Sequence, residues 1–154
     1  MPKIDISKAP LRKGSLYPAP FNEPAAKRER QAVGDAGGLN DFGVNILMLP
    51  PGAWSSQRHW HDKEDEFVYV LTGDELTLIT DTGEEILRPG DCAAFPKTVA
   101  NGHHLVNKSN APATCLEVGT RTIDDSTVYP DVDLFFDGKL GWYTSKSGKP
   151  YPKP

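Results

Sequence analysis

Short apolar runs separated by turn residues fill the middle of the chain, between residues 41 and 121. These runs are rich in β-branched and aromatic residues, and each is about as long as an ordinary strand. No window in this zone keeps the apolar period of a helix, so a parallel sheet with crossover helices is not expected. The expected strands cover 44–49, 66–71, 76–80, 85–87, 91–95, 102–107 and 113–120. The pattern predicts an all-β sandwich or barrel.

The two ends of the chain differ in composition from this middle zone. Residues 1–40 are rich in Pro, Gly, Lys and Arg without a sustained period, and residues 122–154 return to Asp, Pro, Gly and Lys with a few large aromatics. We therefore expect an extended N-terminal arm over 1–40, a barrel over 41–121, and a C-terminal extension over 122–154 that packs on the barrel or on a partner subunit. The residues expected to make this packing are Trp142, Tyr143 and Tyr151.

The composition is that of one globular domain. The chain has 154 residues, of which 38% are hydrophobic and 25% are charged, which is enough for a single core. The net charge of −4 gives no electrostatic reason to bind nucleic acid, and the basic run 27–30 is interpreted as a solvated surface segment. No apolar stretch is long enough for a membrane span or a signal peptide, so we expect a cytoplasmic protein without a membrane partner. Cys92 and Cys115 are expected to be reduced thiols that fill core space.

The densest chemical signal lies in residues 59–66, which read HWHDKEDE. Residues two apart in a strand point to the same face, so His59 and His61 are expected to project side by side. On a helix the same pair would diverge and could not share a metal ion. Glu66 begins the next apolar run and can bring a carboxylate into the same interior. Imidazole and carboxylate together suit Mn, Fe, Co, Ni or Zn.

The other two histidines of the chain, His103 and His104, lie at the edge of another expected strand. Neighbouring residues of a strand face opposite sides, so only one of the two can join the first pair. Strand parity alone does not decide between them. The second histidine would then support the site from outside or contact a ligand at the barrel mouth.

Both histidine clusters lie in segments that resemble the two short motifs of the cupin superfamily, which are small β-barrels. The first motif is matched by Gly52, His59, His61, Glu66 and Gly73, with the family's intervals from histidine to glutamate and from glutamate to glycine. The second motif is matched by Gly90, Pro96, His103 and Asn107. The segment 117–134 also resembles a group of small bacterial cupins, some of which are loosely labelled sugar-phosphate-isomerase-like.

The sequence departs from the family pattern at three places. The gap from Gly52 to His59 is one residue longer than usual, Thr98 stands where the family has a glycine, and the loop 97–102 carries two extra residues. These changes leave the choice between the two neighbouring histidines open. The spacing to Asn107 favours His103.

The resemblance implies an all-β double-stranded β-helix (jelly-roll) cupin barrel with extended N- and C-terminal segments. It also implies one divalent transition metal ion (Mn, Fe, Ni or Zn) bound by His59, His61, Glu66 and His103. Such a metal keeps open positions for a small bidentate ligand, and it can polarise a carbonyl group or, as iron, activate O₂. The function is then isomerisation of a sugar-phosphate-like compound, dioxygenation of a small acid, or non-enzymatic binding and sensing of a small molecule.

Several further side chains are candidates for contacts with that ligand. The residues expected at the pocket are Trp54, Arg58, His104 and Asn107, with Trp60 as a weaker candidate. The residues expected to bind a phosphate group are Arg58, Arg88 and Lys97. Glu64 and Asp65 are interpreted as solvated charges, although either could replace Glu66 if the strand slipped in register.

The outer segments are expected to serve assembly. Small single-domain cupins form dimers in which arms or edge strands are exchanged, so the resemblance implies a homodimer. An exposed strand edge such as 43–49 needs cover, and the arm 1–40 is long enough to supply it.

Overall fold

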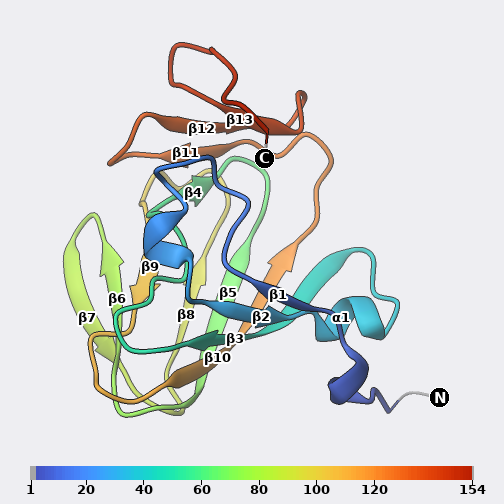
Figure 1. Ribbon diagram of the computed structural model, residues 1–154, viewed down its shortest axis with the longest axis vertical. Helices are drawn as coiled ribbons and strands as arrows, with labels where there is room; N and C mark the ends of the chain where they lie inside the picture. Colours follow the sequence, from blue (N-terminus) through green and yellow to red (C-terminus); the bar gives the residue numbers. More distant parts are fainter. Residues whose placement is uncertain (1–2, 154) are drawn as a thin grey trace.

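Antiparallel strands make up most of the regular structure of the computed structural model, which describes residues 3–153 (Figure 1). The strands are β1 (Leu11–Lys13), β2 (Glu29–Gln31), β3 (Phe42–Leu49), β4 (Trp60–His61), β5 (Glu66–Thr72), β6 (Leu76–Thr80), β7 (Gly83–Leu87), β8 (Cys92–Phe95), β9 (His104–Val106), β10 (Ala113–Thr120), β11 (Thr127–Tyr129), β12 (Leu134–Asp137) and β13 (Trp142–Thr144). The helices are short: η1 (Ile6–Lys8), η2 (Glu23–Ala25) and α1 (Val33–Ala36). Within the described residues, no helix has the length and apolar character needed to cross a membrane.

The strands form three sheets, and the first two enclose the core. The first has the order β1-β2-β3-β10-β5-β8, the second β7-β6-β9, and the third β13-β12-β11-β4. An isolated antiparallel bridge between His59 and His103 connects the last two sheets. Leucines and valines from the first sheet pack against leucines from the second to form the core. This arrangement confirms the predicted all-β jelly-roll fold.

The period-two pattern of the sequence accounts for this core. In β3, Leu47 and Leu49 are fully buried, whereas Met48 between them is 40% exposed. In β5, Val68 and Val70 face inward, whereas Tyr69 faces outward. Since side chains alternate along a strand, the inward face of β5 also includes its first residue, Glu66.

The N-terminal arm is built onto the first sheet. Strand β2 pairs with β3, and β1 pairs with β2, so residues 46–48 of the edge expected at 43–49 are covered by the same chain. Arg30 on β2 donates two hydrogen bonds to the carboxylate of Glu117 on β10, at 2.6 and 2.9 Å. The arm is therefore held to the barrel by the backbone hydrogen bonds between β2 and β3 and by the ion pair between Arg30 and Glu117.

The C-terminal extension adds strands of its own. Strand β11 pairs with β4 and with β12, and β12 pairs with β13, which places this layer at the top of Figure 1. The sequence pattern did not predict these strands, because each has only three or four residues and lies in a zone rich in Asp, Pro, Gly and Lys. Their position beside β4 brings the extension to the histidine segment.

Two interpretations from the sequence are wrong. The run 27–30 is not a solvated segment, because the arm folds back over the barrel and leaves Arg28 only 7% exposed. Cys115 lies in the core as expected, but Cys92 is exposed, because it lies on the outer face of β8 opposite Tyr69.

Thr98 adopts a backbone conformation that favours glycine. Its φ is 66°, in the left-handed region, which explains why the family pattern has glycine at this place. The N–H of Thr98 donates to the backbone oxygen of His61 at 3.0 Å, so the turn lies directly against the histidine strand. A β-branched residue in this region is strained.

We expect Thr98→Gly to raise the free energy of unfolding by about 0.5–1 kcal/mol, because relief of the strain exceeds the greater entropy of glycine in the unfolded chain. Urea denaturation measures this change. Thr82→Gly is the control, since Thr82 is also an exposed turn residue but has no positive φ, and it should lower stability. Equal effects of the two substitutions would contradict the prediction.

Candidate metal centre

Strand pairing brings three histidines to one face. His59 and His103 exchange both backbone hydrogen bonds, at 3.1 and 2.8 Å, and directly opposed residues of an antiparallel pair share a face. Their ring centroids lie 4.9 Å apart. His61, two residues along, shares that face, with its ring centroid 5.0 Å from that of His59. The predicted side-by-side placement of His59 and His61 is therefore present.

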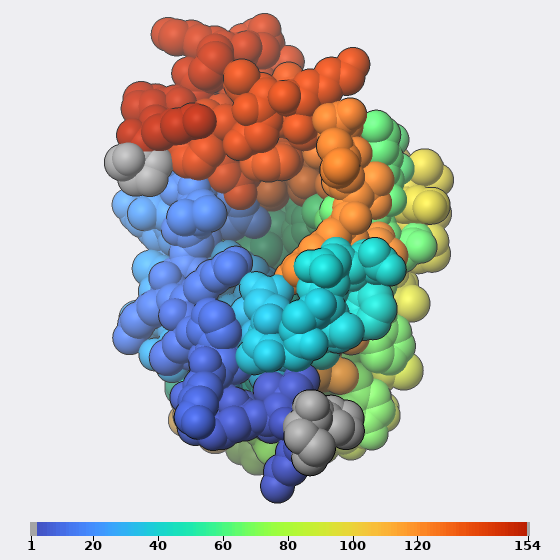
Figure 2. All heavy atoms as spheres, turned by 90° about the vertical axis from the view of Figure 1, so that its right-hand side faces the viewer, coloured from blue at the N-terminus to red at the C-terminus, as the bar shows by residue number. Residues whose placement is uncertain are grey.

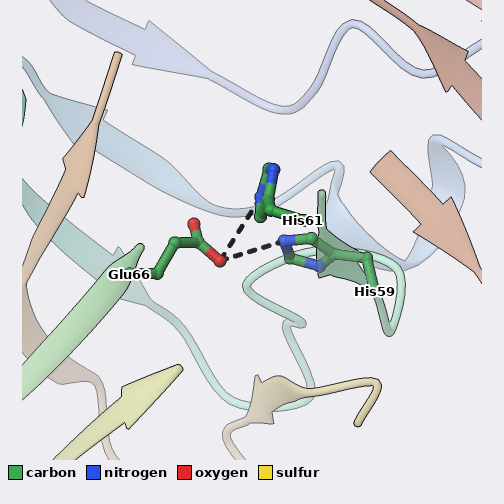
Figure 3. Close-up of side chains that lie close together, drawn as sticks. All are labelled: His59, His61 and Glu66. Carbon is green, nitrogen blue, oxygen red and sulfur yellow. Dashed lines mark ion pairs between the residues drawn. The ribbon is translucent and has the colours of Figure 1, made fainter. Parts of the chain in front are cut away.

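Glu66 lies at the centre of the three imidazoles. Its Oε2 atom is 2.9 Å from Nε2 of His103, 3.3 Å from that of His59 and 3.4 Å from that of His61. Figure 3 shows the carboxylate at the start of β5 with the rings of His59 and His61 directed toward it. Glu66 reaches this position because the inward face of β5, which carries Val68 and Val70, also carries its first residue.

Each imidazole uses its other nitrogen, Nδ1, for an oxygen outside this group. The partners are the carbonyl of Gln57 for His59 at 2.8 Å, the carboxylate of Asp125 for His61 at 2.7 Å, and the carbonyl of Asn101 for His103 at 3.3 Å. In a neutral ring, an acceptor at Nδ1 favours the tautomer with the proton there, and the Nε2 lone pair is then available to a metal.

This donor set fits a divalent transition metal. Three imidazole nitrogens and one carboxylate oxygen converge, and the ligand atoms of His59, His61 and Glu66 lie within 4.8 Å of one another. The hydrogen bonds at Nδ1 are those that orient histidine ligands in metalloproteins. The cluster could therefore hold one metal ion.

The charges of the group are set by mutual contacts. Burial alone would raise the pKa of Glu66, but hydrogen bonds from the three histidines hold its pKa well below the usual range. Burial lowers the pKa of His59 despite the nearby carboxylate, which favours the neutral ring that a metal requires. Burial also opposes the protonation of His61, but hydrogen bonds to Asp125 and Glu66 outweigh it and raise the pKa of His61 to about 10.

His104 faces away from the cluster. It pairs with Ile79 in the β6–β9 ladder, its Nδ1 lies 3.0 Å from the carbonyl oxygen of Ser56, and Trp54 packs edge-on against its ring at 4.7 Å. His103 instead stacks on Phe95, with ring centroids 3.6 Å apart. The strand register thus places His103, and not His104, beside Glu66.

The cluster lies in the wall of a cavity of about 470 Å³. The barrel, the arm and the C-terminal extension all contribute to its lining, and Figure 2 shows the hollow between the orange and red extension and the blue arm. Besides the cluster and His104, the polar and aromatic residues that line it include Tyr17, Tyr129, Tyr143, Glu64, Asp125, Arg12, Arg28, Arg30 and Arg121.

Other candidate residues from the sequence lie elsewhere. Arg58 forms ion pairs with Asp81 and Asp131 on the opposite side of β4, and Asn107 is fully buried, where its amide donates to Leu49 and Ala111. Trp54 packs on His104 outside the cavity lining. Arg88 and Lys97 are exposed and also absent from the lining, so the three residues expected to bind phosphate do not reach this cavity.

Sequence reasoning missed the residues that the outer segments contribute. Asp125 is separated from His61 by 64 positions, and the burial of Arg28 follows only from the folding of the arm. Tyr143 was expected to pack on the barrel or a partner, but its neighbours include Tyr17, at a ring distance of 5.4 Å, on the cavity wall. The cluster of aromatics in the tail was the one available signal.

Comparison with known proteins connects this geometry to a family. The model of the cupin domain matches residues 45–119. The crystal structure of a sugar phosphate isomerase from a cupin superfamily, from Silicibacter pomeroyi, is 47% identical, with a TM-score of 0.91, and the match covers 98% of this chain and 97% of that chain. No curated protein matches the chain.

Two further structures extend the comparison. A putative sugar phosphate isomerase from Acidithiobacillus ferrooxidans is 28% identical, with a TM-score of 0.73, over 84% of this chain and 83% of that chain. A predicted oxalate decarboxylase from Thermotoga maritima is 18% identical, with a TM-score of 0.60, over 78% of this chain and 99% of that chain. The last similarity concerns the fold alone.

We expect Asp125→Asn to lower the pKa of His61 in the metal-free protein from about 10 toward its ordinary value of 6.5, because the carboxylate that stabilises the imidazolium is lost. NMR titration of the histidine rings measures this pKa. Asp62→Asn is the control, since Asp62 is exposed.

The raised pKa of His61 also makes the stability of the fold depend on pH. Because the pKa of His61 is higher in the folded than in the unfolded chain, its stabilising effect is complete below pH 6.5 and is lost as the pH rises toward 10. Asp125→Asn should therefore flatten the pH dependence of unfolding in this window. A titration curve and a stability profile unchanged from those of the wild type would contradict the role of Asp125.

Proposed function

The chain belongs to the cupin superfamily, and from this premise we propose that it is a metal-dependent enzyme that isomerises a small phosphorylated sugar. The observation that carries the proposal is the convergence of three imidazole nitrogens on Glu66 in the wall of a 470 Å³ cavity. The substrate class is supported by the names of the two related structures at 47% and 28% identity.

In this proposal the metal ligands are His59, His61, Glu66 and His103, and the metal is Mn, Fe, Ni or Zn. A divalent ion held by these residues would act as a Lewis acid toward the carbonyl group of the sugar. The side chains hold their Nε2 atoms and carboxylate in place before binding, because each Nδ1 is already fixed by an acceptor.

Isomerisation also needs a group that moves a proton between two neighbouring carbons, and Glu64 is suited to this. It lines the cavity, and its carboxylate lies with His61 and Asp125 in a group whose ligand atoms are within 4.8 Å of one another. The N–H of Thr122 donates to its Oε1 at 2.6 Å. Burial raises the pKa of Glu64, which brings it nearer to the range of an effective base at neutral pH.

The proposed isomerisation neither gains nor loses a proton. Glu64 takes the proton from the carbon next to the carbonyl and returns it to the former carbonyl carbon, while one proton moves between the two oxygens. Burial raises the pKa of Tyr17, Tyr129 and Tyr143, so their hydroxyls stay protonated and can donate to substrate oxygens. No net oxidation occurs.

A homodimer in the cytoplasm remains part of the proposal. The outer face of the first sheet carries Met48, Phe67, Tyr69 and Leu71, which are 37% to 40% exposed. An apolar stripe of this kind is typical of a surface that pairs with another subunit.

The metal site is tested by metal analysis of protein purified without a metal-affinity tag. We expect about one divalent ion per chain in the wild type, and loss of most of it in the His59→Ala/His61→Ala double variant, because half of the donors are removed. His104→Ala, which leaves the cluster intact, is the control and should retain the ion. Full occupancy in the double variant would exclude this site.

The reaction is tested by NMR of metal-loaded protein in D₂O with a panel of aldose and ketose phosphates. We expect interconversion with exchange of the proton next to the carbonyl, and a rate about 10²–10⁴-fold lower for Glu64→Gln with unchanged metal content. Glu75→Gln, at an exposed surface ion pair with Arg88, should retain the wild-type rate.

The same measurements separate the alternatives. Retention of metal and ligand without turnover would instead identify a binding protein, and O₂ consumption limited to the iron form would identify an oxygenase. Equal rates for the Glu64 and Glu75 variants would remove Glu64 from the mechanism while leaving the isomerase proposal standing.

A further inference from the structure

Arg28 is a buried cation that contacts no carboxylate among the residues that the structure describes. The residue is only 7% exposed, and it lines the cavity. Nε donates to the carbonyl oxygen of Gly14 at 2.9 Å, and Nη1 donates to the carbonyl oxygen of Ser55. Within residues 3–153, Arg28 forms no ion pair with a carboxylate. A buried charge of this kind is costly unless a counterion joins it.

Each of the other arginines that line the cavity has a carboxylate partner. Arg30 forms two hydrogen bonds with Glu117, at 2.6 and 2.9 Å. Arg12 and Arg121 both pair with Asp35. Among the cavity arginines in the described part of the chain, Arg28 is therefore the one that contacts no carboxylate.

The surroundings of Arg28 favour an added anion. Burial and the charge of Arg30 both lower the pKa of Arg28, so an anion at this place would relieve an electrostatic cost. Of the five N–H donors of a guanidinium, two are used for Gly14 and Ser55, and about three remain. Arginine binds phosphate oxygens especially well through such paired donors.

A continuous wall connects Arg28 with the histidine cluster. The guanidinium carbon of Arg28 lies 6.0 Å from the ring centroid of Tyr17. The Tyr17 and Tyr129 centroids are 5.6 Å apart, and the Tyr129 and His59 centroids are 5.8 Å apart. Tyr143 packs against Tyr17 at 5.4 Å. Arg28 and the histidine cluster therefore lie in the wall of the same cavity, joined by aromatic rings.

We propose that Arg28, together with the hydroxyl groups of Tyr17 and Tyr143, forms the subsite that binds the phosphate group of the ligand, with the carbonyl end at the histidine cluster. This rests on the proposed function for the identity of the other end. A phosphate monoester carries a charge of about −1.5 to −2 at pH 7 and three acceptor oxygens, which match a guanidinium and neighbouring hydroxyl donors.

The test is calorimetric binding of inorganic phosphate to metal-loaded wild type and Arg28→Gln, with the metal content of each sample measured. We expect Arg28→Gln to bind phosphate about 10- to 100-fold more weakly with unchanged metal content, because a charge-assisted contact is lost. Arg88→Gln, at an exposed arginine outside the cavity, should bind as the wild type does. Acetate should bind the wild type at least about tenfold more weakly than phosphate, because it offers fewer acceptors and less charge.

Two milder variants keep the proposal testable if Arg28→Gln does not fold. Arg28→Lys retains the charge but loses the paired donors, and Tyr17→Phe/Tyr143→Phe removes two hydroxyls without a change in the arginine, so both should weaken phosphate binding several-fold. Wild-type phosphate affinity in all folded variants of Arg28, or equal affinity for acetate and phosphate, would overturn the subsite.

The outcomes distinguish this inference from the proposed function. Phosphate binding that depends on Arg28 in a protein without bound metal or turnover would support the subsite and contradict the isomerase. Metal-dependent isomerisation with phosphate affinity independent of Arg28 would do the reverse.

Discussion

The backbone pairing of His59 with His103 is the constraint on which the centre depends. These two residues exchange both backbone hydrogen bonds, and this register decides which side chains share a face. A slip by one residue would turn Trp60 or His104 toward Glu66 and the histidines away from it. This pairing places the three imidazoles on one face, and strand β5 brings the Glu66 carboxylate to within 2.9 to 3.4 Å of them.

The cavity combines contributions from three parts of the chain. The barrel supplies the histidines and Glu66, the arm supplies Tyr17 and Arg28, and the extension supplies Asp125 with further tyrosines. The barrel therefore provides the groups suited to a metal, whereas the outer segments provide most of the groups suited to the rest of a ligand. The arm owes its position to the β2–β3 ladder and to the pair between Arg30 and Glu117.

The sequence predicted what depends on local pattern. Alternation along β3 and β5 was sufficient for the all-β core, and the two-residue spacing of His59 and His61 was sufficient for their shared face. The choice between His103 and His104 was not predictable in this way, because it depends on which residue lies opposite His59 in a long-range pairing.

The remaining errors have the same physical origin. Arg28 reads as a surface residue in its own segment, and it becomes buried only because the arm folds over the barrel. Asp125 lies 64 positions from the histidine that it contacts, so nothing near it in the sequence indicates a role. Contacts between distant segments decide both cases.

The joining of the arm to the barrel by Arg30 and Glu117 has an evolutionary consequence. Because strand β2 fixes the arm to the barrel, substitutions elsewhere in the arm can reshape the cavity wall that it forms. The four proposed metal ligands need not change. Selection can therefore act on ligand preference and on reactive chemistry as two nearly separate traits. Divergence among proteins of this architecture should be concentrated in the terminal segments, with the barrel ladder preserved.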